Sequence, residues 1–167
     1  MRLRRKSSGL AREAVAIGFA VLVGASAPVL AQDSRPFAML AGSWSGGGTV
    51  SVSNGTNERI RCNASYDVVN PKTVQLSLRC ASDSYNFNLL SEITYEGGAI
   101  SGSWTEATRN AAGRVSGHAS GGQIQVVAKG GSFSADLTLQ TRGNRQSVTI
   151  RSTGSEVTGA SITMTRK

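Results

Sequence analysis

The chain is poor in the side chains that most often perform chemistry. It has one histidine, His118, and two cysteines among its 167 residues, so no ligand set stands at the spacing that a zinc site needs. A Gly-x-Ser-x-Gly nucleophile elbow is also missing. Haem would need an axial ligand such as histidine, but Gly117 and Ala119 are expected to face inward, which turns His118 toward water. We therefore predict a non-enzymatic protein with no metal and no cofactor.

Acidic residues are few, and three of them gather around one predicted hairpin. Paired carboxylates can act as general acid and base. Glu92 and Glu106 are expected on the polar face of their strands, and Glu96 lies beside a turn. We interpret all three as solvated charges, because an ionised carboxylate is rarely buried without a partner.

Runs of basic residues are missing as well. The formal net charge is +8, from 18 Lys+Arg and 10 Asp+Glu. Residues 1–31 hold five of the basic residues and one acidic residue, which leaves a net charge of +4 for residues 32–167. The remaining arginines are scattered and are not interleaved with aromatic side chains, as a nucleic-acid-binding face requires. We expect no nucleic-acid partner.

Only one long apolar segment is present, over residues 14–30, and it follows the basic start Met1–Lys6. A basic start, a short apolar run and a small residue at the cleavage point are typical of a secretory signal peptide. The alternative is an uncleaved membrane anchor, for which the run is short. We predict a signal peptide over residues 1–31 that is cleaved after Ala31, then a single domain over residues 32–167. The protein would be periplasmic or secreted, with no stable membrane insertion after cleavage.

Glycine, in contrast, is abundant, with 20 residues. Four glycine-bearing pairs each lie midway between two runs of alternating apolar and polar residues: Gly97-Gly98, Gly121-Gly122, Gly130-Gly131 and Gly143-Asn144. This pattern is the strongest short-range signal for a tight β-hairpin. We predict an all-β fold, an antiparallel up-and-down meander of about ten strands that closes into a barrel, with a β-sandwich as the alternative. Arg35-Pro36 followed by Phe37 and Leu40 predicts a short helical turn before it.

The turns also predict which residues lie opposite one another. In the first hairpin we choose a three-residue loop with Gly55 left-handed, which opposes Val50 with Ile60. The third glycine pair opposes Ala128 with Phe133, and the other pairs likewise oppose apolar with apolar residues. The inward face mixes large side chains with glycine and alanine. Such a mixture either fills the core or leaves a cavity.

The two cysteines fall on neighbouring alternating runs. A hairpin that closes with Val68 opposite Val74 places Cys62 opposite Cys80 on the apolar face. Directly opposed antiparallel residues can meet the distance limits of a disulfide. The alternative, a redox-active pair, has neither a Cys-x-x-Cys motif nor a helix start to lower a thiol pKa. We predict a structural disulfide, which agrees with export.

The segment Leu40–Trp44, Leu-Ala-Gly-Ser-Trp, resembles the Gly-x-Trp start of calycins, the superfamily of lipocalins, fatty-acid-binding proteins and avidins. In that family the tryptophan closes one barrel end under an arginine from a late strand, and the matching pair here would be Trp44 and Arg166. Residues 98–107 look like the second-strand motif of avidins. The chain is also similar to periplasmic metalloprotease inhibitors with a calycin barrel, and from Phe37 onward to uncharacterised small exported proteins of alphaproteobacteria.

The resemblance implies a binding protein. Our leading hypothesis is an exported module that holds a small apolar ligand inside the barrel, lined by Tyr66, Tyr95 and Trp104. The alternative is a periplasmic protein-interaction module such as a protease inhibitor, whose inhibitory segment would match Gln32–Arg35. An envelope structural protein, with neither ligand nor stoichiometric partner, is the third hypothesis.

Overall fold

A computed structural model of the chain describes residues 35–167. The predicted signal peptide and most of the segment compared with protease inhibitors, residues 1–34, lie outside the described residues. The described part contains no helix that is long and apolar enough to cross a membrane. Its strands are β1 (Gly42–Val52), β2 (Asn57–Asn70), β3 (Thr73–Ala81), β4 (Asn86–Glu96), β5 (Ala99–Glu106), β6 (Ala111–Ser120), β7 (Gln123–Gly130), β8 (Phe133–Arg142), β9 (Arg145–Thr153) and β10 (Val157–Arg166).

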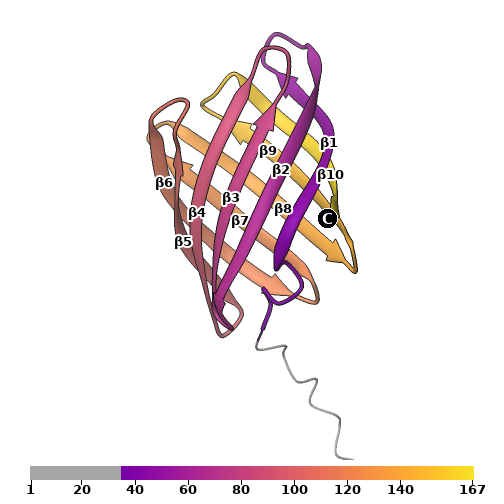
Figure 1. The fold of residues 1–167 in the computed structure, drawn as a ribbon. Coiled ribbons are helices and arrows are strands. Elements are labelled where there is room, and N and C mark those ends of the chain that lie inside the picture. Colours follow the sequence, from indigo (N-terminus) through magenta and orange to yellow (C-terminus); the bar gives the residue numbers. More distant parts are fainter. Residues whose placement is uncertain (1–34) are drawn as a thin grey trace, which may run out of the picture. The chain divides into compact units, whose positions relative to one another are not determined.

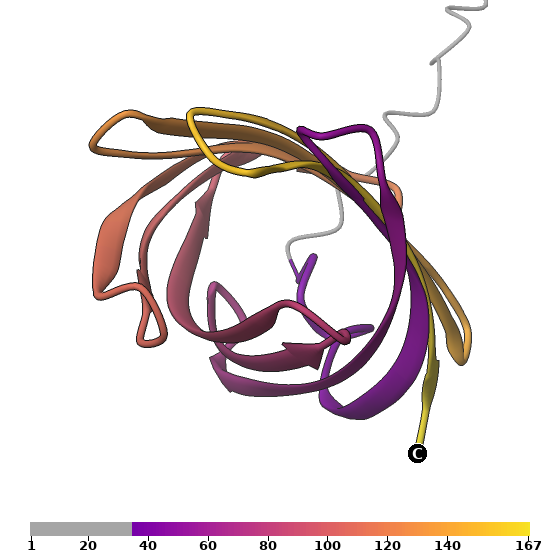
Figure 2. The same cartoon turned by 90° about the horizontal axis from the view of Figure 1, so that it is seen from above.

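These strands form one closed antiparallel barrel. Each strand pairs with its neighbours in sequence, and β1 also pairs with β10, as Figure 1 shows. In Figure 2, which looks into the barrel, the strands form a single ring. The predicted up-and-down barrel is confirmed, and the sandwich alternative is wrong, because all strands belong to one continuous sheet. Closure removes the free strand edges that a flat meander would expose.

A short turn leads the chain into the barrel. The amide of Ala38 donates to the carbonyl of Arg35 at 3.2 Å, and the amide of Leu40 to that of Phe37 at 2.9 Å. Residues 36–40 form consecutive hydrogen-bonded turns, and no helix is formed at the predicted helical turn. Gly42 ends these turns with a φ of 103°, a conformation that favours glycine. The turn lies at one end of the barrel (Figure 1), and the side chains of Phe37 and Leu40 are buried.

Most hairpins have the predicted register. The pairings across Gly97-Gly98, Gly121-Gly122 and Gly143-Asn144 are confirmed, since each turn opposes the expected apolar residues. A two-residue loop with glycine at a positive φ matches the twist of the strands on either side. Local turn chemistry is therefore sufficient to set these registers.

Two predicted registers are wrong, each by two residues. In the first hairpin Gly55 is left-handed as predicted, with a φ of 84°, but the loop begins one residue earlier and pairs Val50 with Glu58. In the β7–β8 hairpin the turn lies one residue later than predicted and pairs Ala128 with Ala135. A shift of two residues keeps every side chain on its predicted face. The inward and outward assignments on these strands therefore hold.

Two glycines of β1 allow it to close against β10. A Cβ atom on Gly46 would overlap the carbonyl oxygen of Thr163, and one on Gly48 would overlap that of Ser161. The backbones approach too closely at these inward positions for any side chain to fit. Glycine at such points lets a sheet coil strongly enough to close.

A disulfide joins β2 to β3, as predicted. Cys62 and Cys80 are directly opposed, with Cα atoms 4.1 Å apart, and both side chains are buried on the inner face. A loop of this length stabilises the fold by about 3 kcal/mol in the chain-entropy model. A structural disulfide is typical of proteins that fold in an oxidising compartment.

Candidate functional site

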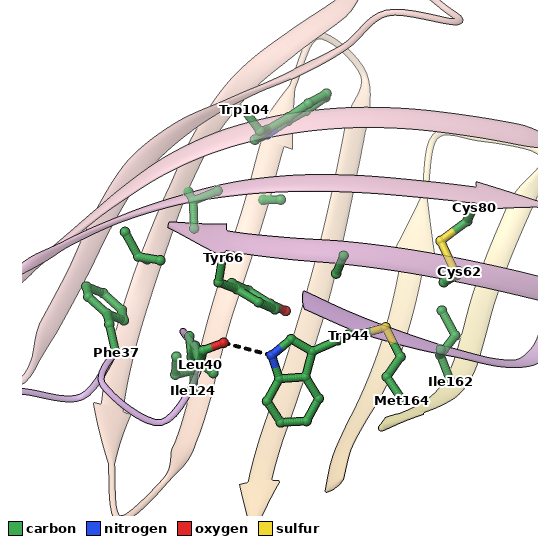
Figure 3. Packing of buried hydrophobic residues seen from close by; sticks show 14 of the residues in the cluster. Phe37, Leu40, Trp44, Cys62, Tyr66, Cys80, Trp104, Ile124, Ile162 and Met164 are labelled. Atoms are coloured by element: carbon green, nitrogen blue, oxygen red, sulfur yellow. Dashed lines mark hydrogen bonds between the residues drawn. A yellow bond between two sulfur atoms is a disulfide. The ribbon is translucent and has the colours of Figure 1, made fainter. Parts of the chain in front are cut away.

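One end of the barrel interior is closed around Trp44. Its indole Nε1 donates to the carbonyl of Leu40 at 2.7 Å, the bond drawn in Figure 3. The Arg166 guanidinium lies 4.5 Å from the centroid of the indole ring, a distance typical of a cation–π contact. Arg166 also donates to the carbonyls of Met39 and Ala41. The arginine thus ties the N-terminal turn to the last strand across the tryptophan.

Two of the three aromatic residues predicted to bind ligand belong to this closed end. The Tyr66 hydroxyl donates to Gln146 Oε1 at 3.1 Å, and Gln146 Nε2 donates to Thr141 Oγ1 at 3.3 Å. Burial raises the pKa of the Tyr66 phenol, and its bond to Gln146 offsets only part of that rise, so the phenol stays protonated at neutral pH. Tyr95 packs edge-on against Phe37, with ring centroids 6.4 Å apart.

The polar members of this cluster were not predicted from the sequence. Gln146 and Thr141 are both buried, and Gln146 is 0% exposed. The one sequence signal for the burial of Gln146 is the alternation of β9, which places Gln146 on the same inward face as Val148. By residue type alone, a glutamine near the start of a strand is expected to be exposed to solvent.

Trp104 lies apart from the two tyrosines. Tyr66, Leu76, Ser91 and Trp104 are successive cross-strand neighbours on β2, β3, β4 and β5. Three strand spacings, or about 14 Å along the sheet, therefore separate Tyr66 from Trp104. In Figure 3, Trp104 lies apart from Trp44 and Tyr66. The structure does not bring the three predicted residues together.

The surroundings of Trp104 differ from those of Trp44. Its ring packs edge-on against Phe133, with centroids 5.6 Å apart. It also lies over Gly113 and Gly130, where an added Cβ would come within 2.8 Å of the indole. The Trp104 Nε1 is buried and has no hydrogen-bond partner among the described residues. A buried donor without a partner costs about 1–3 kcal/mol.

Between these two regions, apolar side chains point inward but are only partly covered. Alternation along β3, β4, β7, β8 and β9 places them on the inner face, and each remains partly exposed. Six of them, which we call the apolar lining, are Leu76, Leu78, Leu89, Val126, Leu137 and Val148. Eight strands make a barrel that side chains can just fill, and ten strands make a wider one. The interior thus keeps accessible apolar surface and is the candidate site.

Glu106 is a predicted surface carboxylate that the structure places inside, so the prediction of a solvated charge is wrong for it. It lies on the same inward side of β5 as Trp104 and is 6% exposed. Its carboxylate accepts the backbone amides of Asn88, Thr108 and Arg109 at 2.8–3.0 Å. Burial raises the pKa of Glu106, but these hydrogen bonds outweigh that effect and the pKa is lowered. The charge therefore holds the β5–β6 loop.

Replacing Glu106 with glutamine is expected to lower stability in a pH-dependent way. The pKa of Glu106 in the fold lies below its ordinary value of 4.5. At pH values above 4.5 the charged carboxylate therefore stabilises the fold. This contribution is lost as the pH falls through the lowered pKa. Because the lost hydrogen bonds are to a charged group, we expect the free energy of unfolding to fall by about 1–2 kcal/mol at pH 7. Urea unfolding of wild type and Glu106→Gln from pH 7 to pH 3 measures it. A difference that does not shrink toward pH 3 would contradict this role.

The other polar candidates face solvent, as predicted. Glu92, Glu96 and His118 are all exposed, and His118 Nε2 lies 3.0 Å from Gln125 Oε1. Within residues 35–167, no three His, Cys, Asp or Glu side chains come close enough together to hold a metal ion.

Two hollows lie on the outside of the barrel wall. One of about 450 Å³ opens over β2 to β5, where Gln75 and Glu92 line it, and one of about 500 Å³ opens over β2 to β4, where Arg61 and Arg79 line it. These residues occupy outward positions that alternate with the inward ones. The smaller hollow is also lined by Leu76, Ser91 and Trp104, and the larger one by Cys80 and Phe87, which all occupy inward positions.

Comparison with known proteins identifies the fold but no family. No protein-family model and no curated protein matches the chain. The crystal structure of Rv2717c from M. tuberculosis is similar with a TM-score of 0.64 at 12% identity, over 83% of this chain and 99% of that chain. The S-type phycobiliprotein lyase CPES from Guillardia theta has a TM-score of 0.57 at 12% identity, over 83% and 94%. EF1p2_mFAP2b has a TM-score of 0.51 at 12% identity, over 81% and 99%. Together with the closed barrel, these matches fit a calycin-like, lipocalin-type fold.

Proposed function

We propose that the protein is an exported, non-enzymatic binding protein that holds one small apolar molecule inside the barrel. The observation that carries this proposal is the apolar lining, whose side chains point inward yet keep accessible surface. Covering apolar surface is worth about 25 cal/mol per Å². Small-molecule sites in proteins are mostly apolar, with a few polar groups that orient the ligand.

The polar group available to orient a ligand is the indole of Trp104. Its Nε1 is buried and has no partner among the described residues, so a ligand whose acceptor displaces the groups that cover this atom would gain a bond. The Tyr66 hydroxyl is already bonded to Gln146, and Tyr95 is packed against Phe37. We therefore assign Trp104 to direct ligand contact and the two tyrosines to the floor of the site.

One of the similar structures supports a small-molecule ligand. EF1p2_mFAP2b was solved bound to DFHBI, so a barrel of this fold takes up a small molecule. Export is supported by the predicted signal peptide over residues 1–31 and by the disulfide. Residues 32–167 would then be the mature, single-domain protein.

Native mass spectrometry of the protein purified from its own source tests the proposal. We expect the mass of the chain plus one small molecule, which is released on denaturation. The Trp104→Phe variant keeps a ring but loses the N–H donor, so it should retain less of that molecule. A bound protein in place of a small molecule would favour the interaction-module hypothesis. A bare chain that also fails to take up the neutral apolar probe N-phenyl-1-naphthylamine would contradict the proposal.

A further inference from the structure

The larger outer hollow is lined by side chains suited to a polar ligand. It lies over β2, β3 and β4, which are side by side in Figure 1. Its volume is about 500 Å³. Arg61 and Asn63 of β2, Arg79 of β3, and Asn86 and Asn88 of β4 line it. All five stand at outward positions. Cys80, Ala81, Phe87 and Thr108 complete the lining.

Among the residues that the structure describes, the two arginines in the hollow have no acidic partner. Arg61 and Arg79 are exposed. The salt bridge found within residues 35–167 joins Arg109 to Glu106 and involves neither of them. No aspartate or glutamate of residues 35–167 lines the hollow. Both guanidinium groups therefore keep their hydrogen-bond donors and charge available to an anion.

Two further cations stand at the rim. Arg109 Nη1 donates to the carbonyl of Asn86 at 3.2 Å. Lys167 Nζ donates to the side-chain oxygen of Asn63 at 3.0 Å. These contacts hold both cations beside the residues that line the hollow. Arg109 is also ion-paired with Glu106, so Lys167 is the rim cation whose charge adds to that of Arg61 and Arg79 in attracting anions.

The strands hold these side chains in a fixed arrangement. Asn63, Arg79 and Asn88 are direct cross-strand neighbours. The disulfide lies behind them, because each of the two arginines immediately precedes one of the bonded cysteines. The donors therefore project from a covalently joined strand pair, and their backbone positions need not change when a ligand binds.

We propose that this hollow binds a phosphate group carried on a hydroxylated molecule of about the size of a sugar phosphate. Each guanidinium group can present two parallel N–H donors to phosphate oxygens. The side-chain amides of Asn63, Asn86 and Asn88 can both donate to and accept from hydroxyl groups. The volume falls within the range of roughly 300–1,000 Å³ that is usual for small-molecule sites. Binding here is independent of a ligand in the interior.

Isothermal titration of the purified protein with glucose 6-phosphate tests the site, with glucose and inorganic phosphate as comparison ligands. We expect saturable binding of one glucose 6-phosphate per chain, tighter than either comparison ligand. The Arg61→Gln/Arg79→Gln variant should raise Kd at least tenfold. The matched control, Arg142→Gln/Arg145→Gln, removes the same charge from a cross-strand pair at the β8–β9 turn and should change Kd less than twofold.

Vesicles of phosphatidylcholine with and without phosphatidylglycerol distinguish a lipid headgroup from a soluble ligand. Binding to the anionic vesicles alone, lost in Arg61→Gln/Arg79→Gln, would assign the phosphate to a lipid. Equal weakening by the control variant would overturn the site in favour of general charge attraction. Equal affinity for inorganic phosphate would overturn the assignment to a hydroxylated molecule. Absence of binding to both glucose 6-phosphate and anionic vesicles would overturn the proposal. Uptake of N-phenyl-1-naphthylamine should be unchanged in both variants, which separates this site from the interior.

Discussion

Replacing Gly48 with alanine is expected to prevent the barrel from closing. A Cβ atom at this position would overlap the carbonyl oxygen of Ser161 and press on the Cα of Ile162. Both contacts are with the backbone of β10, which can move away only by giving up its pairing with β1. Losses above about 4 kcal/mol are exceptional for a single substitution and need such a cause. We expect a loss of at least this size, measured by urea unfolding followed by circular dichroism.

The control for this substitution is the neighbouring residue. Thr49 is exposed on the outer face of the same strand, so Thr49→Ala should change the free energy of unfolding by less than about 0.5 kcal/mol. If Gly48→Ala unfolds at the same urea concentration as Thr49→Ala, the close approach of β1 and β10 does not limit closure. In that case the account of the strand glycines is wrong.

Replacing Trp44 with alanine is expected to open the closed end of the barrel. The indole is fully buried, bonded to the carbonyl of Leu40 and covered by the Arg166 guanidinium. Removal of a buried tryptophan side chain costs about 3–5 kcal/mol. The loss should lie at the upper end of that range, because the tether from Arg166 to the N-terminal turn depends on the ring beneath it. Thermal and urea unfolding both measure the change.

Trp44→Phe separates packing from hydrogen bonding at this end. The variant keeps an aromatic ring beneath Arg166 but loses the donor to Leu40, a bond worth about 1 kcal/mol. It should therefore be clearly more stable than Trp44→Ala. Equal stability of the two variants would show that the ring contributes nothing beyond its N–H, and a loss below about 1 kcal/mol in Trp44→Ala would contradict the role of this end in the fold.

Most of the fold follows from local features of the sequence. A glycine pair between two alternating runs specifies a turn, a register and a face without reference to the rest of the chain, as at Gly97-Gly98. The cysteine pairing follows in the same way from one hairpin. The two wrong registers occur where several turn positions were open, after Val52 and around Gly131. At these two turns, the position of the loop depends on how each strand of the hairpin packs against the strand on its other side.

The candidate site was harder to predict, because it depends on residues far apart in the chain. Alternation placed Tyr66, Tyr95 and Trp104 on the inner face, but it contains no information on their positions around the ring. Glu106 was assigned to the surface because of its charge, although it shares the inward face of Trp104. Its burial depends on three amides, two of which come from a loop that follows it. Whether ten strands leave space inside is a property of the closed ring.

The central claim is that the barrel interior binds a small apolar molecule, and a matched pair of variants tests it. Val126 belongs to the apolar lining and pairs with Leu137, whereas Val127 lies on the outer face of the same strand and pairs with Asp136. Phenylalanine at position 126 would fill part of the interior. Phenylalanine at position 127 adds the same volume outside.

The measurement is a fluorescence titration with N-phenyl-1-naphthylamine, with circular dichroism to verify that each variant is folded. We predict that wild type and Val127→Phe bind one probe per chain with similar Kd. Val126→Phe should bind at least tenfold more weakly, a loss of about 1.4 kcal/mol. Equal binding by folded Val126→Phe and Val127→Phe, or no saturable binding by wild type, would contradict the claim that the interior is the site.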